Sequence, residues 1–455
     1  MIERLLELAG RRADGGADVL WRRVERTAVA FEWGRLKAAG ATEEAGVNLR
    51  VRHRGRVGVA GLTGVPVADG AAPASNGGAQ QAAPLLDRAL ASAELGEELE
   101  LVFPSRSPFP DVPTHFDRAA GASLEQLIQI GRGLLERLAR EGCQVNVAVE
   151  RELSETRVAN TAGALGSYPA TGVAVSAEVW RIAGDDVLLI GDAYEGADLP
   201  SDGVLDALVG SVATRLDLAL RIVAAPEGAL PVVFTPAGLS PITLPVTQGL
   251  SGKAVLQGIS PLASRVGERV FDERLSVTDD PLLPGRTASR PLDDECVPSR
   301  ATSLVERGIV RRFVYDLETA ARAKTASTGH GHRGIFGKPV PAYTNLVLAA
   351  TDEVSGKTHP ELGGGLLRDI TDGLLVDDLI GVGQGNVIGG AFSHPVALAY
   401  RVERGEITGR VKDAAVAGNA YELLKRIGGF GNDARWTGAR FAPSLLLEGV
   451  SIARR

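Results

Sequence analysis

The chain has 455 residues, which is too long for one ordinary hydrophobic core, so the sequence predicts two domains. Its formal net charge of -7 argues against a general nucleic-acid-binding surface, because such a surface needs a basic footprint to displace counterions. We therefore expect a peptide or a small molecule as substrate, and no nucleic-acid partner.

Cysteine usage and apolar patterning predict the compartment. The two cysteines, Cys143 and Cys296, lie far apart and outside any CxxC pair, which is typical of a reducing environment and excludes a disulfide framework. The first residues carry Glu3 and Glu7 within their apolar pattern, unlike a signal peptide. No uninterrupted apolar run reaches about 18 residues, the length of a membrane-spanning helix. We expect a cytoplasmic protein with no membrane partner.

The first half of the chain alternates amphipathic helical patterns with strand patterns of period two. The clearest helix start is the capping box of Ser123 and Gln126, which predicts a helix as far as Gly142. Residues 61–80, rich in Ala, Gly and Pro, predict a loop. The other expected helices span 2–13, 85–95 and 202–222, and the expected strands lie at 47–51, 57–59, 145–149, 158–161, 173–179 and 187–190. Residues 1–224 are thus predicted to form an α+β domain with an antiparallel sheet.

A joint containing Pro and Gly at residues 224–231 predicts the domain boundary, so the second domain is expected to span residues 225–455. Beyond the joint, long helical patterns are scarce, and short apolar segments alternate with Gly-containing turns. The expected strands lie at residues 304–315, 344–349, 373–380, 396–401 and 445–452, with one late helix at 419–428. The second domain is predicted to be mostly antiparallel β, which makes the whole chain α+β.

The six histidines give little support for a metal site. None is followed by Glu, so the HExxH zinc motif is absent. His330 and His332 form the only close pair, and a metal site there would need a further ligand such as His394 or an acidic side chain. The glycines and threonines around the pair favour a plain turn whose histidines bond backbone groups. We expect no metal or other cofactor on this chain.

Three further stretches favour simple structural interpretations. The glycine-rich residues 381–389 lack the helix that must follow a phosphate-binding loop, which favours a β-turn region. The acidic runs at 279–280 and 293–295 are expected to be solvated surface. Cys296 follows the second run, whose negative field should raise its thiol pKa and disfavour a nucleophile. A Cys–His pair or a Ser–His–Asp triad stays open, but no GxSxG elbow marks a serine.

Several stretches, taken in chain order, resemble a known family. They are GVNLRVRHRGRVGVAGLT, RVANTAGALGSY, SGKAVLQGISPLASRVGERVFDERLSVTDDP, LDDECVPSR, AKTASTGHGHRG, LLVDDLIGVGQGNVIGGAFSHPVALAYRVERGEITGRV, AGNAYELLKRIGGFGNDARW and FAPSLLLEGVSI. Together they resemble the TldD/PmbA peptidase family, also described as modulators of DNA gyrase, over nearly the whole chain. The resemblance implies a heterodimeric metallopeptidase that degrades unfolded or leader peptides. Its TldD-type subunit carries an HExxxH zinc motif, and its TldE (PmbA) subunit does not.

Within the family, the chain resembles the TldE-type branch. In TldD-type chains a Gly-Leu-x-Gly step closely follows HExxxH, and matching that step to residues 249–252 places the two histidine positions on Thr243 and Gln248 and the general-base glutamate on Leu244. Thr and Gln are poor zinc ligands, and leucine cannot take a proton from zinc-bound water. The third TldD-type ligand is a cysteine soon after Ile-Gly-Asn-Asp, and no cysteine follows the matching residues 431–433.

Pro245 lies within the same segment. If Ser240 caps a helix with Pro241 in its first turn, Pro245 removes an interior hydrogen bond, at a cost of about 3 kcal/mol unless the helix breaks there. The local scaffold is therefore expected to differ from a zinc-binding helix.

The resemblance implies a subunit that is catalytically inactive alone and completes a substrate chamber, with zinc and the catalytic Glu supplied by a TldD-type partner. An unfolded peptide would be held in extended form along a strand edge. The expected substrate-binding residues are His330, His332 and Asn386, in the motif-rich β half. Two alternatives stay open. The chain could belong to a specialised subunit pair that trims one precursor or carrier peptide in a biosynthetic pathway, or be a homodimeric binding or regulatory protein with no peptidase role.

Overall fold

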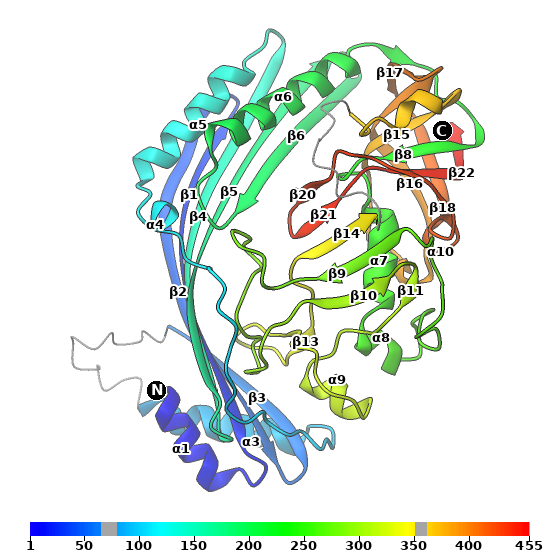
Figure 1. The fold of residues 1–455 in the computed structure, drawn as a ribbon. Helices are drawn as coiled ribbons and strands as arrows, with labels where there is room; N and C mark the ends of the chain where they lie inside the picture. The colour runs from blue at the N-terminus through cyan, green and yellow to red at the C-terminus, as the bar shows by residue number, and fades with distance from the viewer. Residues whose placement is uncertain (65–79, 351–361, 455) are drawn as a thin grey trace.

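The computed structural model describes residues 1–64, 80–350 and 362–454. Figure 1 shows a long curved sheet on one side of the molecule. The C-terminal half packs against the concave face of this sheet, which we call the inner face. This long sheet is antiparallel throughout, in the order β3-β2-β1-β4-β5-β6. Its strands are β1 Ala17–Glu32, β2 Arg35–His53, β3 Arg56–Thr63, β4 Cys143–Asn160, β5 Leu165–Ala183 and β6 Asp186–Gly196. At about 3.3 Å per residue, the longest strands extend about 60 Å.

Helices cover one face of the long sheet, which we call the outer face. Val19 of β1 packs with the first two helices, and Val29 of the same strand packs with two later ones. Because side chains of a strand alternate between its faces, these two valines mark the same face. The helices of this half are α1 Ile2–Arg12, α3 Ala82–Glu94, α4 Asp117–Ala120, α5 Leu124–Leu138 and α6 Asp202–Ala219. The even-numbered residues of β1, such as Asp18 and Arg22, lie on the opposite face and contact residues of the C-terminal half.

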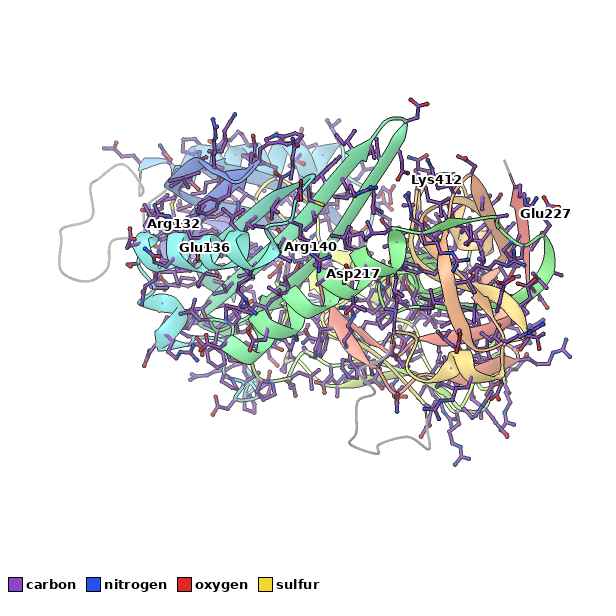
Figure 2. The ribbon with its side chains drawn as sticks, turned by 90° about the horizontal axis from the view of Figure 1, so that it is seen from above. Arg132, Glu136, Arg140, Asp217, Glu227 and Lys412 are labelled. Carbon is purple, nitrogen blue, oxygen red and sulfur yellow. The ribbon has the colours of Figure 1, made fainter. Side chains whose placement is uncertain are left out.

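The predicted capping box of α5 is confirmed. The Ser123 hydroxyl accepts a hydrogen bond from the Gln126 backbone N–H at 3.2 Å, and the Gln126 side chain accepts one from the Ser123 N–H at 2.8 Å. Figure 2 shows α5 and α6 lying along the outer face, with Arg140 beside Asp217 where the two helices end. These two side chains form an ion pair. The pair joins the helices at the surface.

The C-terminal half contains two further sheets and a short ribbon. One sheet has the order β11-β10-β9-β14-β21-β20, and the other has the order β15-β8-β22-β18-β16-β17-β7. In the second, β15 also pairs with β16 and β19 pairs with β22, so that sheet closes on itself. Most neighbouring strands are antiparallel, while β14–β21, β15–β8 and β17–β7 are parallel. The predicted α+β class with antiparallel sheets is therefore correct.

The strands of the C-terminal half are short, apart from β16 and β22. Their bounds are β7 Ile222–Val223, β8 Gly228–Phe234, β9 Leu275–Asp279, β10 Thr302–Glu306, β11 Ile309–Val310, β12 Gly331–His332, β13 Val340–Pro341, β14 Leu346–Ala350, β15 Asp372–Leu379, β16 Ala391–Glu403, β17 Glu406–Val411, β18 Ala414–Asn419, β19 Ile427–Phe430, β20 Arg435–Thr437, β21 Arg440–Ala442 and β22 Leu445–Arg454. The helices are α7 Ser240–Gly249, α8 Gly252–Leu256, α9 Leu317–Arg322 and α10 Ala420–Leu423, with 3-10 turns η1 Leu366–Asp369 and η2 Val387–Gly389. The domain boundary after residue 224 stays a prediction.

Several sequence-based boundaries need correction. The strands expected at 145–149 and 158–161 are parts of one strand, β4. Of the loop expected at 61–80, residues 61–63 end β3, while 65–79 lie outside the described residues. The helix expected at 419–428 has the predicted Asn cap but ends at Leu423, because the chain then turns to pair β19 with β22.

The proline-containing helix α7 also differs from expectation. It begins after Leu239 rather than after a Ser240 cap, and it continues through Pro245 without a break. The Tyr421 hydroxyl donates a hydrogen bond to the Pro245 carbonyl at 2.8 Å. Buried packing of this kind holds helices whose local sequence is unfavourable.

Among residues 1–64, 80–350 and 362–454, no helix is both long and apolar enough to cross a membrane.

Candidate functional site

Three adjoining cavities form a groove between the inner face of the long sheet and the C-terminal half. Their volumes are about 310, 160 and 320 Å³. The first two share Glu152 and Ser154, and the last two share Glu195, so the cavities follow one another along the sheet. We call them the sheet groove, with the first cavity as its Arg290 end and the third as its Trp436 end. Cavities of this size accommodate small ligands or short peptide segments.

Side chains from both halves of the chain line the Arg290 end. Arg22 and Tyr168 come from β1 and β5, whereas Arg290 comes from a C-terminal loop and His332 from β12. Arg22 Nη2 donates to Asp294 Oδ1 at 2.8 Å, and His332 Nδ1 lies 2.9 Å from Asp294 Oδ2. The His332 side chain is 51% exposed, so its ring is accessible from the cavity. This end of the groove therefore forms only when the two halves dock.

Asp294 is buried beneath the Arg290 end and fixes its charged side chains. Burial alone would raise its pKa, but the hydrogen bond with His332 and the positive charges of Arg22 and Arg290 hold the pKa of Asp294 well below its usual range. Asp294 is therefore an anion at neutral pH. It orients Arg22 and His332 without itself reaching the cavity.

A buried ionic cluster lies next to this end and joins the halves. Arg50 donates to Asp18 at 2.5 Å and to Glu295 at 2.6 Å, while Arg333 donates to Asp18 at 2.8 Å. Burial raises the pKa of Glu295 to about 8, although the Arg50 guanidinium opposes this shift. The expectation that the acidic run at 293–295 is solvated is wrong, because all three side chains are 0% exposed. Hydrogen bonds from arginines of the long sheet and from backbone N–H groups satisfy the buried carboxyl oxygens of this run.

Cys296 follows the acidic run in an unusual conformation. Its φ of 63° lies in the left-handed region, and its side chain is buried. Burial raises the pKa of the Cys296 thiol, and the carboxylates of Asp18 and Asp293 raise it further. The predicted direction of the shift is thus confirmed, and this thiol is a poor nucleophile.

The three predicted substrate-binding residues lie in different surroundings. His332 lines the Arg290 end. His330 is 1% exposed, with Nδ1 3.0 Å from a carbonyl oxygen in its own turn and Nε2 3.0 Å from Asp279 Oδ2. Asn386 lines a separate cavity of about 130 Å³ together with His394. Of the three, the structure brings His332 to the groove, and their binding roles stay predictions.

The positions matched to the zinc motif lie on α7. Thr243 Oγ1 accepts a hydrogen bond from Arg440 Nη1 at 2.8 Å, and Arg440 Nη2 donates to the Pro236 carbonyl at 2.7 Å. Leu244 is half-buried, and Gln248 is exposed. The resemblance places the third zinc ligand soon after residues 431–433. Arg440 follows this segment and contacts Thr243, so the structure brings this part of the chain close to α7.

These residues do not fit a zinc ion. Zn²⁺ in proteins is bound by thiolate, imidazole or carboxylate groups, whereas α7 offers a hydroxyl, an aliphatic chain and an amide. The guanidinium at Thr243 adds a positive charge where a cation would have to bind. No group of three or more His, Cys, Asp or Glu side chains within the described parts of the chain is arranged to hold a metal ion.

The Trp436 end combines an aromatic ring, a paired charge network and a strand edge. The Arg286 guanidinium carbon lies 4.1 Å from the centroid of the Trp436 ring. Arg215 bonds Asp377 at 2.8 Å and Asp192 at 3.2 Å, and Arg435 bonds Asp192 at 2.8 Å. The two guanidinium groups thus balance the two carboxylates. Strand β20, which contains Trp436, is the edge strand of its sheet. Edge strands carry backbone groups that can pair with an added strand.

Comparison with known proteins places this fold in a family. A family model described as the PmbA/TldA metallopeptidase C-terminal domain matches residues 227–454, half of the chain. The chain belongs to the PmbA/TldD family. The predicted resemblance is thereby confirmed, and the matched region contains α7, Arg290, His332 and Trp436.

Two curated relatives of this PmbA/TldD chain come from Haemophilus influenzae. A metalloprotease TldD homolog is 30% identical over 211 residues, which cover 46% of this chain and 42% of the relative. A metalloprotease PmbA homolog is 28% identical over 227 residues, which cover 49% of this chain and 46% of the relative. The match thus spans less than half of the length of each relative.

Solved structures match the whole fold. TldE from Thermococcus kodakarensis has a TM-score of 0.85 at 23% identity, covering 99% of both chains. A Thermotoga maritima protein described as a candidate modulator of a DNA gyrase has a TM-score of 0.83 at 23% identity, also covering 99% of both chains. At this identity the likeness establishes the fold of the PmbA/TldD chain.

Sequence reasoning missed Arg22, Arg290 and Trp436, which line the groove. It also missed Arg440, which contacts Thr243 on α7. Arg290 lies four residues before Asp294 in the stretch SRPLDDE, where a basic residue beside an acidic run was the available signal. Arg22 and Trp436 lack such a signal, because the partners that hold them, Asp294 and Arg286, lie more than 100 residues away in the chain.

Proposed function

We propose that this chain is a TldE-type subunit of a heterodimeric metallopeptidase, and that a TldD-type partner supplies the zinc ion and the catalytic Glu. The observation that carries the proposal is the contact between Thr243 and Arg440. It puts a guanidinium on the first of the positions matched to the zinc motif, and neither Leu244 nor Gln248 offers a zinc ligand. The likeness in fold to a TldE protein supports the same assignment.

The sheet groove supports a peptide substrate held in extended form. Its cavities follow one another along the inner face of the long sheet, and the edge strand β20 lines its Trp436 end. A peptide added to a strand edge is held by backbone hydrogen bonds, which are independent of sequence. This mode admits unfolded segments of varied sequence and excludes folded proteins, whose backbone groups are already paired.

The proposal is tested by coexpressing the chain with a TldD-type protein. We expect a stable heterodimer that cleaves an unfolded peptide faster than either protein alone, and no cleavage once the HExxxH glutamate of the partner is replaced. Absence of a complex, or a complex that leaves the partner's cleavage rate unchanged, would refute the subunit role. A stable homodimer in its place would favour a binding protein without peptidase function.

Two further measurements sharpen the test. Purified alone, the chain should retain well below one zinc per chain after dialysis, and one tightly bound zinc that is lost in a His330 or His332 variant would contradict the proposal.

Trp436→Ala should slow peptide cleavage by the complex without dissociating it. The matched control Trp33→Ala, at an exposed hairpin tip, should cleave like the unmodified complex.

A further inference from the structure

Arg290 is the least satisfied buried cation at the sheet groove. Its side chain is 10% exposed, it lines the 310 Å³ cavity, and its Nε is buried without a hydrogen-bond partner. Its guanidinium makes no hydrogen bond to any residue that the structure describes. The ion pair recorded for it is a long one, 4.0 Å to Asp294 Oδ1. Buried polar groups are nearly always bonded, so an unbonded guanidinium facing a cavity calls for a ligand.

Buried carboxylates near Arg290 balance its charge, but none of them lies within hydrogen-bond distance of its guanidinium. The Asp294 oxygen that faces Arg290 already accepts from Arg22 at 2.8 Å. Glu152 is the one carboxylate among the described residues that line this cavity, and it pairs with Arg26 at 2.8 Å. His332 adds a second ring nitrogen beyond the one that meets Asp294. The cavity thus exposes one guanidinium with unused donors, that of Arg290, beside the bonded Arg22 and the second ring nitrogen of His332. Unused guanidinium donors match the oxygens of an anion.

We propose that the Arg290 end binds the terminal carboxylate of a peptide, with Arg290 as its principal ligand and Arg22 and His332 beside it. A guanidinium presents parallel N–H donors that match the two oxygens of a carboxylate. The cavity is too small for a folded surface and opens past Ser154 into the rest of the groove, which leaves a path for the residues before the terminus. The inference rests on the proposed peptide substrate. It goes further by stating that the chain recognises the C-terminal end of that peptide.

The site gives a peptide a fixed direction in the groove. With its carboxylate at Arg290, the preceding residues extend over Ser154 toward Glu195 and the Trp436 end. Glu195 and Glu150 line the middle cavity, so that part of the groove does not favour an acidic segment. The middle of the groove therefore disfavours a carboxylate, whereas the Arg290 end offers it a guanidinium without a hydrogen bond. This chain would thereby recognise the end of a peptide while its partner cleaves it.

The test compares two short labelled peptides of the same neutral sequence, one ending in a carboxylate and the other in a carboxamide. Binding to the isolated full-length chain is measured by fluorescence anisotropy, and repeated with the heterodimer. We expect the carboxamide to bind about tenfold more weakly, because a charge-assisted hydrogen bond is lost. Arg290→Gln should abolish this difference. The control Arg300→Gln, at an exposed arginine ten residues along the chain, should preserve it.

Each outcome decides a separate question. Equal affinity for the two peptides, or no binding of either, overturns the carboxylate site even when the heterodimer forms and cleaves. Selective binding of the carboxylate peptide without any heterodimer supports this site and refutes the subunit role. Displacement of the peptide by a lower concentration of inorganic phosphate than of free peptide identifies a phosphate site instead and overturns the proposal. If Arg290→Gln loses its far-UV circular dichroism, the comparison of the two peptides on the unmodified chain still decides.

Discussion

At the scale of single residues, the acidic run at 293–295 shows what local sequence leaves open. Consecutive acids usually face water, yet here each one is buried. Two of them accept hydrogen bonds from Arg22 and Arg50, more than 240 positions earlier in the chain, at distances of 2.8 and 2.6 Å. A pattern confined to ten residues cannot predict partners that only the docking of two halves provides. The direction of the pKa shift of Cys296 could be predicted from Asp293, which is close in sequence, but the larger contributions of burial and Asp18 could not.

Asp294→Asn is expected to destabilise the protein by about 3 kcal/mol at pH 7, because it leaves Arg22 and Arg290 without a buried counterion. The pKa of Asp294 is held below its usual 3.8 in the folded state, so its stabilising contribution is present above about pH 4 and is lost as the pH falls further. The difference in unfolding free energy between the variant and the unmodified chain should therefore shrink at acid pH. Urea unfolding across this pH range measures it.

The matched control for this prediction is Asp185→Asn, at an exposed hairpin between β5 and β6. It removes the same charge without removing a buried ion pair, and should change stability by no more than about 0.5 kcal/mol. A difference for Asp294→Asn that stays constant from pH 7 to pH 3 would contradict the lowered pKa.

At the scale of elements, patterns within a few neighbouring residues predicted the helices and strands that local sequence determines. The Ser123 capping box, the amphipathic stripes of α1, α5 and α6, and the strand patterns of period two all correspond to observed elements. Lengths were less predictable. The full extent of β4 depends on pairing with two long neighbours, β1 and β5, and the early end of α10 depends on β19 joining β22. Both are decided by contacts distant in sequence.

Gly61 tests how closely a C-terminal loop packs on the long sheet. A Cβ added at Gly61, in β3, would lie 2.1 Å from the Ile335 carbonyl oxygen, well inside van der Waals contact. Asn48 on the adjacent strand donates to the same carbonyl at 2.9 Å, so the loop cannot shift without losing that bond. Gly61→Ala should therefore destabilise the protein by about 1–3 kcal/mol, measured by thermal or urea unfolding.

The control for Gly61→Ala is Gly210→Ala, on the exposed face of α6, where an added Cβ meets nothing within 4 Å. Alanine is the better helix former, so this variant should gain about 0.5–1 kcal/mol. Equal stability of the two variants would show that the loop is free to move away from the sheet.

At the scale of the whole molecule, the candidate site belongs to the interface between the halves. The sequence predicted the fold class and the family, while the missing zinc ligands on α7 stay a prediction from the resemblance. It did not predict the sheet groove, because each end is assembled from β1, β5 or β6 on one side and C-terminal loops on the other. The buried pairs of Arg50 with Glu295 and of Arg333 with Asp18 hold these sides together.

This arrangement predicts that the two halves unfold together, although the sequence predicts a domain boundary at residue 224. Separating them would break the contacts of Glu295 with Arg50 and of Arg333 with Asp18, a loss of several kcal/mol. Calorimetry should therefore give one transition whose van't Hoff and calorimetric enthalpies agree. Arg333→Met removes one of these charge pairs, retains most of the side-chain volume, and should lower the transition temperature. Two resolved transitions in the unmodified chain, or a stable proteolytic fragment ending near residue 224, would show instead that the halves fold independently and that the groove is an adjustable joint.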